Sequence, residues 1–115
     1  MPTIEPKTIT AQNRAGGKGE IYITHLLSEN ELAGQCKMFA KVTVPPGSSL
    51  GTHYHHGDTE TYHILSGTGT YTDNDKTYEV KPGDTTFCPD GSMHAIENTG
   101  TEDLIFVALI INSPV

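Results

Sequence analysis

The sequence predicts an all-β domain, a sandwich or barrel built from many short strands. With 115 residues, the chain is long enough for one domain with its own core. Its 12 Gly and 7 Pro residues recur along the chain, which favours tight turns over long helices. Between those turns, segments with β character follow one another at a spacing of about 8–12 residues, which is typical of sandwiches and barrels.

Residues 34–44 form the clearest predicted strand, because Met38, Ala40 and Val42 alternate with polar residues. Asp73, Asn74 and Asp75 separate two further segments and predict a hairpin turn. Residues 30–34 suit either a short helical turn or a loop, and the sequence leaves both open. The predicted strands cover residues 20–27, 34–44, 53–55, 60–65, 68–72, 76–80, 85–88, 94–97 and 104–111.

The chain divides into an N-terminal arm and one barrel domain. Residues 1–20 are polar and end in a glycine-rich run, so we expect an arm or loop there. Residues 21–115 are expected to form the single barrel domain. The last predicted strand, residues 104–111, is apolar on both faces. Either it lies centrally in the sheet of a monomer, or a second subunit covers its outer face; the sequence does not separate these alternatives.

Composition and charge narrow the range of partners. The formal net charge is −7 and Arg14 is the single arginine, so the chain lacks a basic groove and we expect no nucleic-acid partner. We see no signal peptide and no apolar stretch long enough to span a bilayer, and therefore expect a cytoplasmic protein without membrane contact. Cys36 and Cys88 are too few for a disulfide framework, and we expect two packed free thiols.

Four of the 6 histidines lie between His53 and His63. His53 and His55 are two residues apart on a predicted strand, so their imidazoles point to the same face. Glu60 opens the next strand after a glycine-containing turn and can lie opposite this pair. Imidazoles and a carboxylate on an inward face would satisfy one another through a shared metal ion. A lone His-x-His is more often a solvated pair, but Glu60 and a distant fourth ligand add weight to a metal site.

Two segments carry a more specific pattern. The first, residues 47–67, has the form G-x5-H-x-H-x4-E-x6-G, and the second, residues 83–98, has the form G-x5-P-x-G-x2-H-x3-N. Both resemble the two signature motifs of the cupin superfamily at every fixed position, and residues 68–82 between them resemble the short spacer of small single-domain microbial cupins. The motif positions are Gly47, His53, His55, Glu60 and Gly67, followed by Gly83, Pro89, Gly91, His94 and Asn98.

This resemblance implies a double-stranded β-helix, or jelly-roll, barrel of the cupin type. It also implies that His53, His55, Glu60 and His94 bind one divalent transition metal. Resembling proteins use manganese, iron, nickel, zinc, copper or cobalt, and this ligand set does not choose among them. Together with the two-sided apolar strand, the resemblance also leads us to expect a homodimer.

Two further residues are candidates for catalysis. Tyr62 lies on the same side of its predicted strand as Glu60, where it can hydrogen-bond a substrate or act as an acid; a core tyrosine is the alternative. His56 lies in the loop beside the predicted ligands, where it can shuttle protons, or it is simply a solvated loop histidine. The predicted pocket around the metal is mostly apolar, with Met38, Ala40, Val42 and Ile96 in its walls.

The sequence leaves several functions open. The first is a metalloenzyme acting on a small organic molecule, of the dioxygenase, isomerase or decarboxylase type. The alternative is a non-catalytic module that binds or senses a small ligand through its metal, and in a third reading the metal only stabilises the fold. Similar cupins that decarboxylate oxalate rely on an inward arginine. Arg14 lies in the polar N-terminal stretch and is not expected to face the pocket, which counts against an oxalate-type ligand.

Overall fold

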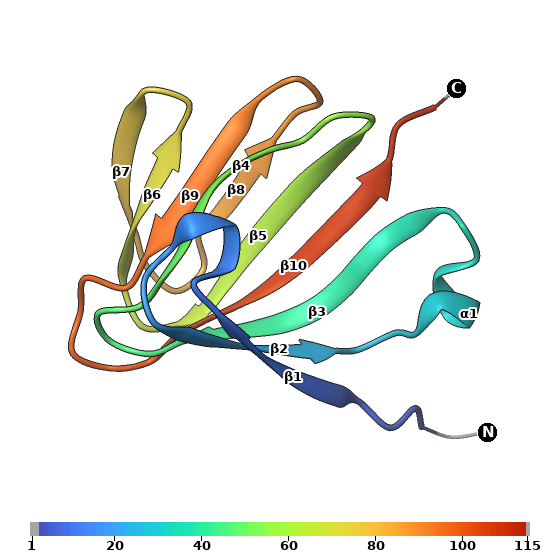
Figure 1. Cartoon of the computed structure of the whole chain (residues 1–115), viewed down its shortest axis with the longest axis horizontal. Helices are drawn as coiled ribbons and strands as arrows, with labels where there is room; N and C mark the ends of the chain where they lie inside the picture. Colours follow the sequence, from blue (N-terminus) through green and yellow to red (C-terminus); the bar gives the residue numbers. More distant parts are fainter. Residues whose placement is uncertain (1–2, 115) are drawn as a thin grey trace.

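The computed structural model describes residues 3–114, which form two antiparallel sheets with one short helix and one short 3₁₀ turn (Figure 1). In chain order the elements are β1 (Lys7–Gln12), η1 (Arg14–Gly16), β2 (Glu20–His25), α1 (Glu29–Leu32), β3 (Cys36–Val44), β4 (Ser49–Tyr54), β5 (Asp58–Ser66), β6 (Gly69–Asp73), β7 (Lys76–Val80), β8 (Thr85–Cys88), β9 (Met93–Glu97) and β10 (Leu104–Asn112).

The larger sheet has six strands in the order β1-β2-β3-β10-β5-β8, and the smaller has four in the order β4-β9-β6-β7. One apolar core lies between them, because alternate residues of each strand turn inward. All-β architecture is therefore confirmed. The buried core residues are Ile21, Ile23, Ala40, Val42, Val44, Tyr62, Ile64, Tyr71, Val80, Ile96, Leu104, Phe106 and Ala108.

The expected closed barrel is wrong in one respect, since the strands form two separate sheets instead of one continuous cylinder. The chain passes from β3 in the larger sheet to β4 in the smaller one through Pro45, Pro46 and Gly47. Proline has no N–H to donate to a strand ladder, so hydrogen bonding between neighbouring strands is interrupted at this corner. The sandwich therefore has edge strands, which are β1 and β8 in the larger sheet and β4 and β7 in the smaller sheet.

The segment expected to form an arm or loop, residues 1–20, contains a strand and a short 3₁₀ turn. Strand β1 lies within this segment and pairs with β2, placing Ile9 opposite Ile23. Five of the six residues of β1 are exposed. An edge strand that buries so little needs no strong apolar alternation, which explains why its sequence did not identify it.

Strand β10 lies in the middle of the larger sheet, between β3 and β5. Leu104, Phe106 and Ala108 are fully buried in the core. Ile105 and Val107 alternate with them, face outward and are half-buried. Within residues 3–114, one apolar face of β10 is therefore fully covered and the other only in part.

Residues 30–34, which suited either a helical turn or a loop, contain most of a helical turn, α1. Ser28 precedes this single turn and forms a capping box, in which its backbone N–H donates to the Glu31 carboxylate over 2.9 Å. Neither α1 nor η1, the helices of the described residues, is long and apolar enough to cross a membrane.

Candidate metal centre

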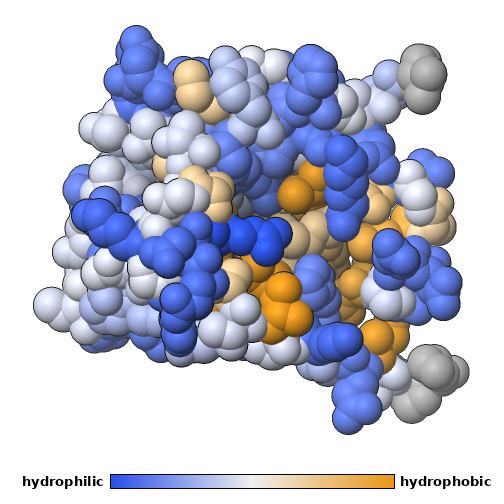
Figure 2. All heavy atoms as spheres, viewed as in Figure 1, coloured by the Kyte–Doolittle hydropathy of each residue, from blue (hydrophilic) through white to orange (hydrophobic). Residues whose placement is uncertain are grey.

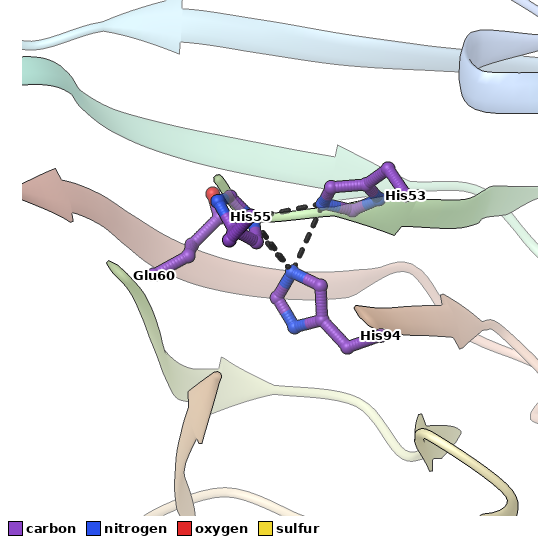
Figure 3. Close-up of side chains that lie close together, drawn as sticks. All are labelled: His53, His55, Glu60 and His94. Carbon is purple, nitrogen blue, oxygen red and sulfur yellow. Dashed lines mark hydrogen bonds and ion pairs between the residues drawn. The ribbon is translucent and has the colours of Figure 1, made fainter. Parts of the chain in front are cut away.

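Four side chains from three strands converge at one point inside the sandwich (Figure 3). His53 and His55 come from β4 and the loop after it, Glu60 from β5 and His94 from β9. Strands β4 and β9 pair with His53 directly opposite His94, so their rings turn toward each other. One ligand atom from each residue lies within 4.8 Å of all the others. The structure thus brings together all four residues that the motifs indicated.

A single carboxylate oxygen lies at the centre of this cluster. Oε1 of Glu60 is 2.9 Å from Nε2 of both His55 and His94, and 3.2 Å from Nε2 of His53. Glu60 is only 2% exposed. Burial opposes ionisation of this carboxyl group, but the hydrogen bonds and charges of the neighbouring imidazoles outweigh it and lower the pKa of Glu60 to about 2. Glu60 is therefore an anion at neutral pH.

In His53 and His55, the ring nitrogen that faces away from the cluster lies next to an oxygen. Nδ1 of His53 lies 2.9 Å from the carbonyl oxygen of Gly51, and Nδ1 of His55 lies 2.7 Å from a carboxylate oxygen of Asp58. In a neutral ring, the nitrogen facing a carbonyl or carboxylate oxygen carries the proton and donates it. This leaves the Nε2 lone pair of each ring directed at the centre of the cluster, which is the tautomer that a metal ligand requires.

Asp58 also links the cluster to the ammonium group of Lys37. Nζ of Lys37 lies 2.7 Å from the second carboxylate oxygen of Asp58, whose first oxygen accepts from His55. Burial acts to raise the pKa of Asp58, but the hydrogen bonds from Lys37 and His55 outweigh it and the pKa is lowered. A fixed carboxylate behind a ligating histidine orients the ring and raises its basicity.

His94 is held by two tyrosines. The Tyr71 hydroxyl lies 2.7 Å from Nδ1 of His94, and the Tyr62 ring stacks on the imidazole with centroids 4.8 Å apart. Burial and the nearby histidines outweigh the effect of Glu60 and lower the pKa of His94. The ring is therefore fully enclosed and favours its neutral form, which is the form that binds a metal.

The donor set fits a cation. Nε2 of His94 lies 2.9 Å from Nε2 of His53 and 3.1 Å from Nε2 of His55. Imidazole lone pairs and a carboxylate that face one another so closely repel, unless protons or a cation lie between them. Three imidazole nitrogens and one carboxylate oxygen form a ligand set typical of divalent transition metals. The four residues can hold one such ion.

A cavity of about 250 Å³ opens beside this cluster. His53 and Glu60 lie in its wall, whereas His55 and His94 do not, so the cluster meets the cavity along one side only. Figure 2 shows hydrophobic residues exposed within a hollow of this face of the molecule. The lining residues are Arg14, Ala15, Ile21, Ile23, Met38, Val42, Leu50, His53, Glu60, Tyr62, Ala108 and Ile110.

The structure places the two candidate catalytic residues differently. Tyr62 lines the cavity, and its buried hydroxyl has no hydrogen-bond partner among the described residues. His56 is exposed in the turn after β4 and is not part of the cavity wall. Cys88 is a buried free thiol outside that wall, and burial together with the Glu60 charge raises its pKa to about 11.

Arg14 corrects an expectation, because it does line the cavity. Burial and the charge of Arg14 act to lower the pKa of His53. The contacts with Glu60 and Gly51 outweigh them, so the pKa of His53 is raised. The turn η1 folds back onto β4, and no pattern in a polar segment reveals that long-range contact.

Sequence reasoning also missed Asp58 and Tyr71. Asp58 lies three residues after His55, at the start of β5, and this short spacing was an available signal. Tyr71 reaches His94 only because β6 pairs with β9 in a register that places Tyr71 opposite Ile96. That register is a tertiary property.

Comparisons with known proteins agree with this geometry. The family model of the cupin domain matches residues 40–110. The chain is 46% identical to the "Oxalate-binding protein" of Thermotoga maritima over 108 residues, covering 94% of this chain and 88% of that protein. A Thermotoga maritima crystal structure described as a predicted oxalate decarboxylase superposes with a TM-score of 0.91 at 44% identity, covering 95% of each chain.

A cupin 2 conserved barrel domain protein of Rhodopseudomonas palustris shares the fold at only 17% identity, with a TM-score of 0.77 over 96% of this chain and 74% of that one. Both signature motifs fall within or beside the matched residues, and the predicted double-stranded β-helix architecture is confirmed. The chain belongs to the cupin domain family.

Proposed function

We propose that this protein binds a small dicarboxylate of the oxalate class through one divalent transition metal held by His53, His55, Glu60 and His94. The observation that carries this proposal is the position of the cluster, which is buried on most sides and meets a cavity through His53 and Glu60. When bound there, the metal would supply a positive centre that accepts ligand oxygens. The name of the Thermotoga maritima relative supports the choice of ligand.

Binding without turnover is the reading that the cavity supports best. Apart from the proposed metal ligands, the titratable residues of its wall are Arg14 and Tyr62. A guanidinium and a phenol are both protonated at neutral pH, so neither can act as a general base. The exposed His56 lies outside this wall, and its catalytic role stays a prediction. A wall of this kind suits a binding or sensing module better than a dioxygenase or an isomerase.

A decarboxylase is the second candidate, and Tyr62 favours it. Loss of carbon dioxide from a bound dicarboxylate leaves a carbanion that must gain a proton. The Tyr62 hydroxyl has no partner among the described residues and lines the cavity, so it can donate that proton. The relative described as a predicted oxalate decarboxylase agrees with this alternative.

Calorimetry on the intact protein tests the proposal. Protein purified without added metal is analysed for bound ions and titrated with oxalate, before and after removal of the metal by a chelator. We expect one metal per chain and saturable oxalate binding that disappears after chelation. Carbon dioxide and formate are measured in the same samples, and their formation would favour the decarboxylase. Oxalate binding that survives chelation unchanged would contradict the proposal.

The variant His94→Ala, with His63→Ala as its matched control, tests the ligand assignment. His94 is fully buried in the cluster, whereas His63 is exposed on the opposite face of β5 and contacts Thr85. We expect His94→Ala to lose most of its bound metal and His63→Ala to keep it. Full metal occupancy in His94→Ala would exclude this residue as a ligand.

The protein is also proposed to act as a homodimer in the cytoplasm. A row of outward side chains crosses the larger sheet at Phe39, Leu109, Thr61 and Phe87, which are neighbours in register. Phe87 is 57% exposed, and a second copy of the chain would cover such a row. Two free cysteines agree with a reducing compartment.

A further inference from the structure

His53 differs from the other two histidines of the cluster in what holds its ring. Its side chain is 24% exposed, against 5% for His55 and 0% for His94. A carboxylate contacts the outer nitrogen of His55 and a buried tyrosine contacts that of His94, whereas Nδ1 of His53 lies 2.9 Å from the backbone carbonyl oxygen of Gly51. The direction of the His53 ring therefore depends on where the backbone of Gly51 lies.

Gly51 lies at an irregularity in the pairing of β4 with β9. The register between these strands shifts between Leu50 and His53. Two residues of β4, Gly51 and Thr52, therefore face one residue of β9, Ala95, which is the pattern of a β-bulge. A bulge re-aims side chains and disrupts the ladder locally, so the ladder alone does not fix the backbone of Gly51.

The loop between β1 and β2, residues 13–19, packs directly on this bulge. A Cβ on Gly51 would overlap the Ala15 carbonyl oxygen, and a Cβ on Gly17 would overlap the Ser49 carbonyl oxygen. Glycine is required at both positions, because the two backbones lie in contact there. A shift of the loop would therefore change the position of Gly51 and of its carbonyl oxygen.

Hydrogen bonds hold the loop of residues 13–19 against β4. The backbone N–H of Ser49 donates to the Lys18 carbonyl oxygen over 2.9 Å, and the Lys18 N–H donates to the Ser49 hydroxyl oxygen over 2.9 Å. Within the loop, the Asn13 side-chain amide donates to the Gly17 carbonyl oxygen over 3.0 Å. Asn13 and Ala15 have φ angles of 49° and 53°, a left-handed conformation that persists where the surrounding structure fixes it. The loop is therefore a fixed support for the bulge.

We infer, resting on the proposed function, that Gly51 is a positioning residue for the metal ligand His53, and that the loop of residues 13–19 sets metal affinity by holding Gly51 in place. The Gly51 carbonyl oxygen keeps the proton on Nδ1 of His53, so Nε2 keeps its lone pair for the ion. The other two histidines do not depend on the loop, because a carboxylate and a tyrosine orient their rings. Loosening the loop should therefore reach metal affinity through His53.

The variant Gly17→Ala loosens the contact from the loop side and leaves every residue of β4 unchanged. Its control is Gly100→Ala, where the nearest atom to the new Cβ would be the side-chain hydroxyl of Thr68 and not a backbone atom. Chelator competition measures zinc affinity, and NMR of the zinc-loaded proteins follows exchange of each Nδ1 proton with water. We expect Gly17→Ala to bind zinc about 10-fold more weakly, with faster exchange at His53 and unchanged exchange at His55. Gly100→Ala should match wild type.

Ser49→Ala is a second variant, and it carries the test if circular dichroism shows that Gly17→Ala does not fold. It removes the hydroxyl that accepts from the Lys18 N–H and adds no bulk. We expect a smaller loss of zinc affinity, about 3-fold, with the same faster exchange at His53.

Wild-type protein separates failure of this inference from failure of the proposed function. If wild type binds no zinc, the proposed metal site fails and the inference falls with it. If wild type binds zinc and Gly17→Ala and Ser49→Ala bind it equally well, only the inference fails. A loss of affinity with equal changes in exchange at His53 and His55 would indicate general loosening and overturn the inference. An equal loss in Gly100→Ala would overturn it too.

Discussion

The hydroxyl of Tyr71 lies 2.7 Å from Nδ1 of His94, on the side of the ring that faces away from the metal cluster. Burial raises the pKa of Tyr71 to about 12, so this hydroxyl stays protonated at neutral pH. When Nδ1 of His94 donates to the tyrosine oxygen, Nε2 is left with a free lone pair for a metal. The contact with Tyr71 is therefore compatible with the tautomer of His94 that can act as a ligand, and it fixes the orientation of the ring.

Replacement of Tyr71 by Phe should weaken metal binding about 10-fold while leaving the fold intact, because the ring loses its orienting contact. Competition with a coloured chelator measures this affinity. The control is Tyr78→Phe, since Tyr78 lies opposite Tyr71 in the β6–β7 pair and is 50% exposed. Equal affinities in the two variants would contradict the orienting role.

Asp58→Asn should weaken metal binding by about 10- to 100-fold, since the amide cannot match a carboxylate as acceptor for the His55 ring proton and loses the Lys37 ion pair. The same chelator competition gives the affinity, and circular dichroism checks the fold. Asp84→Asn is the control, because Asp84 makes a similar but more exposed pair with Lys81. If Asp58→Asn bound metal as tightly as wild type, to within about 2-fold, the orienting effect would be contradicted.

The stability of the metal-free protein should depend on Glu60 at low pH. The carboxyl group has an ordinary pKa of 4.5 and a pKa of about 2 in the folded chain. A lowered folded pKa stabilises the native state above pH 4.5, and this contribution is lost as the pH falls toward about 2. Urea unfolding of wild type and Glu60→Gln across that range tests this. The difference in unfolding free energy between the two proteins should change through the window; a constant difference would contradict it.

Metal affinity should fall steeply as the pH drops below the ordinary histidine pKa of 6.5, because protons compete for the three imidazoles. His94 resists protonation to a lower pH than His53 does, since the pKa of His94 is lowered and the pKa of His53 is raised. Metal titrations at several pH values measure the dependence. Affinity that stays constant from pH 8 down to about pH 5 would count against histidine ligands.

The homodimer proposal predicts a mass of two chains by light scattering. Phe87→Ser should weaken association, because it removes an exposed aromatic ring from the outer apolar row. Tyr78→Ser makes a comparable change on the smaller sheet and should leave the mass unchanged. A monomer mass for wild type at all concentrations would remove the proposal.

Local patterns predicted most strands and grouped His53, His55 and Glu60, whereas His94 was indicated by the resemblance to the cupin motifs. His53 and His55 share a face through simple alternation, and the spacing of Glu60 follows from one turn. Contacts that depend on tertiary pairing were not predictable. Strand β1 is mostly exposed, Tyr71 reaches His94 through the register of β6 and β9, and Arg14 reaches the cavity through a loop in which two non-glycine residues, Asn13 and Ala15, are left-handed. Each depends on which distant segments meet.

Gly51 joins the Arg14 loop to His53, and this has a thermodynamic consequence. An ion bound as proposed would fix His53 on β4, and through Gly51 it would also restrict the loop that packs on this strand. A ligand that contacted the ordered loop would then raise the affinity for the ion by the same factor by which the ion raises its own, since linkage between two sites is reciprocal. In a cell rich in the proposed dicarboxylate, the protein would hold its metal ion more firmly. Chelators would then remove the ion more slowly.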